Sequence, residues 1–99
     1  MRRNTIVRNL SFLVALRPPT EAHPKWYAET PSHEGCFSDG DTVDEATENF
    51  KLAFHNYTFD EPLTRKDLVN LDSMAPMWTP EYQGYTFKIT STDLTVEAE

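Results

Sequence analysis

The sequence has few of the residues that build disulfides and metal centres, with one cysteine and three histidines among 99 residues. A single cysteine cannot form an internal disulfide, which fits a reducing compartment. Long hydrophobic runs are also missing, because no apolar stretch approaches the length of a membrane span. We therefore expect a cytoplasmic protein that is not embedded in a membrane.

Positive charge is scarce as well. Nine basic residues stand against sixteen acidic ones, and the net charge is −7. A surface of that sign repels phosphate backbones, so we expect no direct binding to nucleic acid. The same charge attracts a basic protein partner and speeds the encounter with it. It also keeps a domain in solution, so charge alone leaves both interpretations open.

Residues 1–19 begin with basic side chains and continue into an apolar run, as a signal peptide does. The run is short, and Arg17, Pro18 and Pro19 follow it in place of a small-residue cleavage site. Large apolar side chains alternate along it, at Leu10, Phe12, Val14 and Leu16. This period of two predicts a β-strand and not a cleaved leader.

The length and composition predict a single domain over residues 1–99, with its core at about residues 8–91. Apolar and aromatic segments bounded by proline or glycine predict strands at residues 10–16, 25–30, 36–37 and 85–90. Gly40 is expected to allow a tight turn at positive φ. Residues 92–99 are acidic, and we expect them to form a frayed tail.

One long helix is predicted after Thr42, which is a good N-cap with Glu45 three residues later, as in a capping box. Apolar side chains then recur at helical spacing and predict one buried stripe. The stripe consists of Val43, Ala46, Phe50, Ala53, Phe54 and Tyr57. Leu52 is the apolar exception outside it.

A short second helix is predicted at residues 65–71, with Thr64 as its cap. A proline-containing loop follows at residues 73–80 and carries Met74, Met77 and Trp78. The order β-β-β-α-(short α)-β predicts an α+β fold, in which a small, mostly antiparallel sheet packs on one main helix.

The candidate catalytic and metal-binding residues do not form a complete site in the sequence. His33 and Cys36 lie three residues apart, but zinc needs three or four such ligands and the chain adds two more histidines in other segments. The D-G-D run at residues 39–41 lacks the spacing of a calcium loop. A nucleophilic Cys36 needs a base such as His55 beside it, and a two-metal nuclease needs carboxylates from several strands. We expect no enzyme activity, no metal and no cofactor.

The most specific pattern reads G-C-F-S-D-G-D-T at residues 35–42, followed by E-A-T-E-N at residues 45–49. Together with Pro31, it resembles the HicB antitoxin family, in which a strand ends in proline. In that family G-C-x-S/T-x-G-D/E-T follows, and then a helix that opens with x-x-E-A-x-x-N. The sequence departs from the family at His33 and Glu34, where an apolar residue and a proline are usual. It also departs at Thr47, where an apolar residue is common, and at Phe50, where a small one is.

The resemblance implies a partial RNase H-like fold, β-β-β-α-β, without the catalytic acids of a nuclease. It also implies a protein of a bacterium or phage that binds a HicA-type toxin, a small basic mRNA endonuclease with a catalytic histidine. Antitoxins of this kind neutralise the toxin by occluding its active site. The acidic charge of this chain is the expected complement of such a partner, and we also expect a homodimer.

Five residues are candidate contacts with the toxin: Asp41, Asp44 and Glu48 near the start of the long helix, and Trp78 and Tyr82 in the aromatic loop. Many family members carry a C-terminal DNA-binding segment, but nine residues follow Thr90, so we expect none here. Two alternatives stay open. One is an orphan HicB-like regulatory or adaptor module with a different protein partner, and the other is an RNase H-like nuclease.

Overall fold

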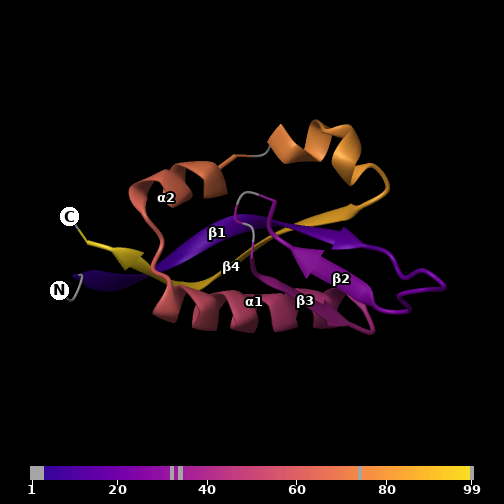
Figure 1. Ribbon diagram of the computed structural model, residues 1–99, viewed down its shortest axis with the longest axis horizontal. Coiled ribbons are helices and arrows are strands. Elements are labelled where there is room, and N and C mark those ends of the chain that lie inside the picture. Colours follow the sequence, from indigo (N-terminus) through magenta and orange to yellow (C-terminus); the bar gives the residue numbers. More distant parts are fainter. Residues whose placement is uncertain (1–3, 32, 34, 74, 99) are drawn as a thin grey trace.

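The chain folds into one antiparallel sheet and two α-helices in the computed structural model, which describes residues 4–31, 33, 35–73 and 75–98. The elements are β1 (Thr5–Arg17), β2 (Trp26–Glu29), β3 (Phe37–Gly40), α1 (Val43–Asp60), α2 (Arg65–Leu71), the 3-10 helices η1 (Ala75–Trp78) and η2 (Pro80–Tyr82), and β4 (Thr86–Glu97). In Figure 1 the strands run between α1 on one side and the segment from α2 to η2 on the other. The predicted α+β architecture is confirmed, and Met74 lies outside the described residues.

The sheet has the strand order β3-β2-β1-β4, and each neighbouring pair is antiparallel. β1 and β4 pair without interruption, from Thr5 opposite Glu97 to Leu16 opposite Thr86. β2 pairs with β1 at residues 15–17. The sheet is therefore a long ribbon of β1 and β4 that widens to four strands at one end.

The expectation of a frayed tail over residues 92–99 is wrong. β4 continues to Glu97, and the core extends beyond residue 91, because Leu94 and Val96 are buried. Leu63 forms a bridge with Val96 and fastens this end of the strand to the segment between the two helices. Leu94 and Val96 are the only large apolar residues in this polar and acidic segment, too few to show the alternation of a strand in the sequence. The strand forms here because it pairs with β1, which the local sequence does not reveal.

The core lies between β1 and α1. The ring of Phe12 meets those of Phe50 and Phe54 edge-on, with centroids 6.0 and 5.1 Å apart. The predicted helical stripe is confirmed. Ala46, Phe50 and Phe54 are buried, and Val43, Ala53 and Tyr57 pack against them.

The start of α1 is capped nearly as predicted. The Thr42 hydroxyl accepts a hydrogen bond from the Glu45 N–H at 3.0 Å. The Glu45 carboxylate accepts one from the N–H of Asp41 at 3.1 Å, one residue before the position expected in a capping box. Both bonds satisfy main-chain donors where the chain leaves β3 and enters the helix.

Side chains of α1 also fasten both edges of the sheet. Asn49 donates a hydrogen bond to the main chain of β3 at 2.8 Å. The Nδ1 atom of His55 lies 2.6 Å from the carbonyl oxygen of Asp93 in β4, and the Thr58 hydroxyl accepts from the next part of that strand at 3.0 Å. The helix therefore holds the two strands at opposite edges in fixed positions.

Gly40 is needed for a reason other than the predicted one. The glycines at positive φ are Gly35 and Gly84, so Gly40 does not use that conformation. A Cβ added to Gly40 would lie 2.5 Å from the main-chain nitrogen of Ala46. The absent side chain therefore lets β3 approach the first turn of α1 closely.

The segment after α1 covers more of the sheet than a loop would. Thr64 and Asp67 form the reciprocal capping box of α2, with bonds of 3.2 and 2.9 Å. The predicted loop at residues 73–80 folds in part into η1 and the start of η2. Tyr82 of η2 packs edge-on against Phe87, with ring centroids 6.2 Å apart, which places η2 against β4.

Candidate functional site

The solvent side of α1 carries two large apolar side chains that the core does not use. Leu52 is 63% exposed and Phe59 is 76% exposed. They are seven residues apart, about two turns or 10 Å along the helix, so they lie in line. Both lie on the side of α1 opposite the buried Phe50 and Phe54. Exposed apolar residues aligned on one helical face are typical of a surface that a partner covers.

Acidic side chains flank this pair. α1 contains four acids, Asp44, Glu45, Glu48 and Asp60, against one lysine, Lys51. Glu61 follows as the C-cap of α1. The C-terminal end of a helix dipole is negative, and the last turn of α1 contains no basic residue that would offset it. We refer to Glu45, Glu48, Leu52 and Phe59, which line the solvent side, as the α1 outer face. It combines apolar contact area with negative charge.

Lysines neutralise part of this charge. The Lys88 ammonium donates to the Asp44 carboxylate at 2.8 Å, and Lys51 lies 3.3 Å from Glu48. The hydrogen bond from Lys88, and then its charge, lowers the pKa of the Asp44 carboxyl. Both carboxylates are exposed, and exposed ion pairs contribute little to stability. A cationic partner can therefore compete with either lysine at little cost to the fold.

The five predicted contact residues lie in two separate regions. Asp41, Asp44 and Glu48 gather at the start of α1, and all three side chains are exposed. Trp78 and Tyr82 lie in η1 and η2, across the strands from α1 in Figure 1. Trp78 is 80% exposed, whereas Tyr82 is 9% exposed and packs on the sheet. Glu48 is part of the α1 outer face and Asp41 and Asp44 adjoin it, whereas Trp78 and Tyr82 lie away from it.

Sequence reasoning noted Leu52 as an exception and missed Phe59. The predicted stripe ends at Tyr57, whereas α1 continues to Asp60. Once the helix is extended by one turn, Phe59 falls in line with Leu52 and away from the buried stripe. The spacing of seven residues between Leu52 and Phe59 therefore indicated a shared helical face. It could be recognised only if the helix was predicted to continue to residue 60.

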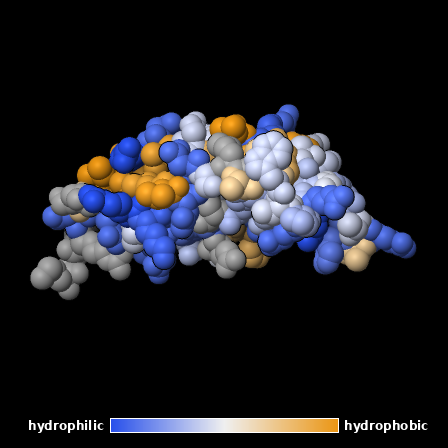
Figure 2. Space-filling model, turned by 90° about the horizontal axis from the view of Figure 1, so that it is seen from above, coloured by the Kyte–Doolittle hydropathy of each residue, from blue (hydrophilic) through white to orange (hydrophobic). Residues whose placement is uncertain are grey.

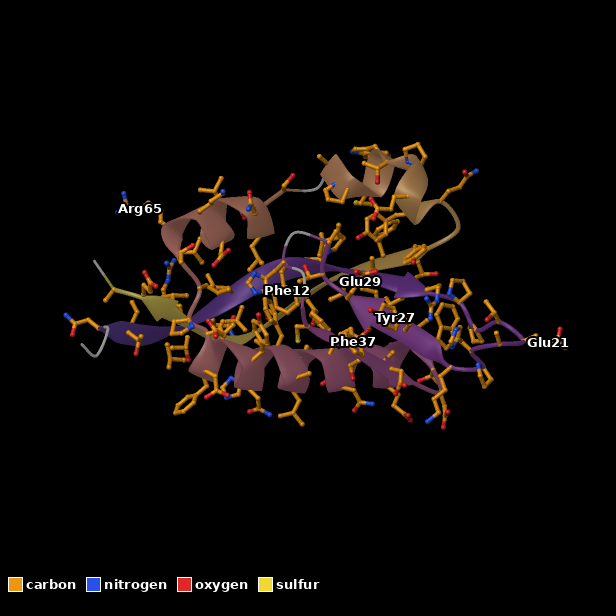
Figure 3. All side chains as sticks on the ribbon, viewed as in Figure 1. Phe12, Glu21, Tyr27, Glu29, Phe37 and Arg65 are labelled. Carbon is orange, nitrogen blue, oxygen red and sulfur yellow. The ribbon has the colours of Figure 1, made fainter. Side chains whose placement is uncertain are left out.

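A second group of side chains lies on the sheet face opposite the core. The rings of Tyr27 and Phe37 stack with centroids 5.5 Å apart, and the Arg17 guanidinium lies 4.6 Å from the centre of the Tyr27 ring. Figure 3 shows Tyr27, Glu29 and Phe37 near one another on β2 and β3. Burial, and then the charge of Glu29, raises the pKa of the Tyr27 hydroxyl. These contacts join β1, β2 and β3 across the face, and they leave Phe37 exposed.

A third group of exposed apolar side chains lies at α2. Figure 2 shows apolar side chains gathered at the end of the molecule where α2 lies in Figure 1. Val69 of α2 is 68% exposed, an exposure close to that of Leu52. Because α2 contains one acid, Asp67, with two basic residues before it, this area lacks the negative charge of the α1 outer face.

His33 and Cys36, considered as metal ligands, make contacts that belong to the fold. The His33 ring lies 5.5 Å from that of Phe54, and its Nδ1 atom is 3.7 Å from Asp67. Cys36 is part of the core, and burial raises the pKa of its thiol, which disfavours the thiolate that metal binding and nucleophilic attack require. In the described part of the chain, no three His, Cys, Asp or Glu side chains gather as a metal site requires. The described helices include none that is long and apolar enough to cross a membrane.

The fold has a counterpart among known structures. The chain matches the crystal structure of the Burkholderia pseudomallei antitoxin HicB with a TM-score of 0.63. The fold is HicB-like. Sequence identity is 21%, and the match covers 84% of this chain but 63% of the other, so the chain spans less than two thirds of that protein. No protein-family model matches the sequence, and no curated protein matches it significantly.

Proposed function

We propose that the protein is an antitoxin that binds a small basic toxin of the HicA type, an mRNA endonuclease, and neutralises it by occluding its active site. The HicB-like fold supports an antitoxin role. The observation that carries the proposal is the α1 outer face, where Leu52 and Phe59 are exposed on a helix with four acids and one lysine.

The apolar and the acidic residues have separate tasks in this interaction. Burying a leucine or phenylalanine side chain against a partner stabilises a complex by about 1.5–3 kcal/mol. Leu52 and Phe59 are therefore the affinity anchors, as central apolar residues are in other interfaces. Glu45 and Glu48, with a chain charge of −7, steer a basic partner toward the helix and raise the association rate.

Neutralisation by this route needs no catalysis by the antitoxin. A toxin that cleaves RNA must present a basic surface to the phosphate backbone. The α1 outer face offers that surface negative charge of the same sign as RNA, together with apolar contacts that RNA phosphates lack. Occupation by the antitoxin and binding of RNA are then mutually exclusive.

Co-expression with a small basic toxin of the HicA type, taken from a reading frame adjacent to this gene, tests the function. The unchanged chain should restore growth, and reversing two charges with Asp44→Lys and Glu48→Lys should reduce the rescue. The matched control reverses two acids outside α1, Glu21 at the far end of the β1–β2 connection (Figure 3) and Glu81 of η2. If the unchanged chain does not restore growth, the antitoxin function is wrong. If both double variants restore growth equally, the function stands and the placement on α1 is wrong.

A further inference from the structure

A small cavity lies where β1 passes into β2, on the sheet face opposite the core. Its volume is about 260 Å³, just below the range of about 300–1,000 Å³ that is typical of sites for drug-sized ligands. The residues that line it are Arg17, His23, Pro24, Lys25, Tyr27 and Asp39. A chain with a net charge of −7 therefore gathers three basic side chains around one cavity.

The strands place three of these residues in one row. Arg17 of β1 pairs with Tyr27 of β2, and Tyr27 pairs in turn with Asp39 of β3. Side chains directly opposite one another in paired strands point to the same face of the sheet. The guanidinium, the phenol ring and the carboxylate therefore lie side by side across that face, at positions that the sheet fixes.

An aromatic ring holds the Arg17 guanidinium. The guanidinium carbon lies 4.6 Å from the centre of the Tyr27 ring, which is a cation–π contact. The Nε–H of Arg17 is buried and has no hydrogen-bond partner among the residues that the structure describes. No ion pair within that part of the chain includes Arg17 either. The Arg17 charge is therefore fixed in position and remains available to an anion, whose oxygens suit the fork of guanidinium donors.

The connection between β1 and β2 presents the other two basic side chains. Thr20 and His23 close a turn in it. The Thr20 N–H donates to the His23 carbonyl at 2.8 Å, and the His23 N–H donates to the Thr20 hydroxyl at 3.0 Å. Lys25 lies 3.9 Å from Asp41, and its side chain is 54% exposed. Because so long and exposed an ion pair contributes little to stability, Lys25 can bind an anion in the cavity at little cost.

We propose that this cavity, the basic pocket, binds the phosphate group of a small hydroxyl-bearing molecule, such as a sugar phosphate or a polyol phosphate. A tetrahedral phosphate accepts hydrogen bonds from several directions, and Arg17, His23 and Lys25 border the pocket from β1 and from the connection that follows it. A planar carboxylate is satisfied by the fork of one arginine. The Asp39 carboxylate repels phosphate but accepts hydrogen bonds from hydroxyl groups, so the organic part of the ligand lies beside Asp39.

The charges around the basic pocket favour a small ligand over a nucleic acid. Asp39 lines the pocket, Asp41 lies beside Lys25, and Glu21 extends from the tip of the β1–β2 connection (Figure 3). A nucleic acid must bring further phosphates past these acids, whereas a single phosphate needs only the three basic side chains. The pocket contains no residue of the α1 outer face, and the proposal stands whether or not the chain neutralises a toxin.

Titration with α-glycerophosphate, followed through the main-chain amide signals in NMR spectra, tests the pocket. The signals of the lining residues should shift and reach saturation. Lys25→Met should weaken binding about tenfold or more, because it removes one charge-assisted hydrogen bond. Lys66→Met is the matched control, since it removes the same charge from an exposed position on α2, and it should leave the affinity unchanged. Arg17→Lys should also weaken binding, because it keeps the charge and loses the planar fork.

Three further probes identify the chemistry of the ligand. Inorganic phosphate should bind more weakly than α-glycerophosphate, and glycerol and acetate should bind more weakly still. Asp39→Asn should reduce the preference for α-glycerophosphate over inorganic phosphate about threefold or more, because an amide oxygen is a weaker acceptor than a carboxylate. An unchanged preference would overturn the role of Asp39.

Several results would overturn the proposal. One is that neither α-glycerophosphate nor inorganic phosphate shifts the signals of the lining residues. Another is that Lys66→Met weakens binding as much as Lys25→Met, because the effect is then one of overall charge. Acetate that binds as tightly as α-glycerophosphate would assign the pocket to carboxylates. An RNA oligonucleotide that binds more tightly, and loses its affinity on Lys25→Met, would assign the pocket to nucleic acid.

Discussion

At the scale of single residues, the exposed fraction decides whether a side chain of a given type stabilises the fold or is available to a partner. Three phenylalanines on α1 show this within ten positions. Phe50 and Phe54 are fully buried and contact Phe12, whereas Phe59 is 76% exposed. The first two stabilise the fold, and the third is free for a partner. The same contrast separates the buried Leu94 from the exposed Leu52.

This contrast predicts opposite effects of one substitution on α1. Phe54→Ala should lower the free energy of unfolding by about 3–5 kcal/mol, because it removes a buried ring and leaves a cavity. Phe59→Ala should change it by less than about 0.5 kcal/mol, because the ring is already in water. Urea denaturation measures both. Equal losses in the two variants would contradict the assignment of Phe59 to the surface.

A second residue-scale prediction concerns the pair of Asp44 and Lys88. The lysine lowers the pKa of Asp44 below the ordinary value of 3.8, so the pair contributes stability above that pH and loses it as the pH falls through the lower, folded value. Replacing Lys88 with methionine should raise the pKa of Asp44. An NMR titration of the Asp44 carboxyl, with Lys25→Met as the control, measures the change. An unchanged titration would show that Lys88 does not bind Asp44 in solution.

At the scale of elements, local signals predicted α1 and could not predict the length of β4. The cap at Thr42 and the stripe through Phe50 and Phe54 depend on residues within a few positions, and both are confirmed. The end of β4 depends on pairing with β1 and on the bridge to Leu63, which lie far away in the sequence. The requirement at Gly40 was missed for the same reason, because it arises from contact between a strand and a helix.

The length of β4 predicts a large loss of stability when Leu94 is truncated, although composition alone predicts a frayed tail at this position. Leu94→Ala should destabilise the protein by about 2–5 kcal/mol, since Leu94 is fully buried. Leu52→Ala, the matched control on the surface, should change stability by less than about 0.5 kcal/mol. Thermal or urea unfolding separates the two. A neutral Leu94→Ala would restore the interpretation of this segment as a frayed tail.

The glycines predict a further contrast at the element scale. Gly40→Ala should cost at least about 3 kcal/mol, because the new methyl group meets the main chain of Ala46. Gly84→Ala should cost about 1–2 kcal/mol, because its φ of 87° is strained for alanine but the space around it is open. Circular dichroism during urea unfolding measures both. A larger loss at Gly84 than at Gly40 would contradict the close approach of β3 to α1.

At the scale of the whole molecule, the surfaces have different characters and can act separately. The α1 outer face is acidic and apolar and suits a basic partner, whereas the apolar area over α2 lacks that negative charge. Composition and the positions of Asp41, Asp44 and Glu48 predicted negative charge near the start of α1, where the structure shows these side chains exposed; their contact with a toxin stays a prediction. The apolar part of the candidate site could not be predicted, because Phe59 is recognisable only when the end of α1 is known. Trp78 and Tyr82 were grouped by their place in the loop, and packing separates them.

The affinity of the chain for a HicA-type toxin tests the central claim, the proposed toxin binding by the α1 outer face, most directly. Calorimetry at low salt should show that the double substitution Leu52→Ser and Phe59→Ser weakens binding by about 100-fold or more, because it removes both anchors. Val69→Ser, which removes an equally exposed side chain from α2, should leave the affinity unchanged. Wild-type affinity in the folded double variant would contradict the assignment of the α1 outer face as the toxin-binding surface.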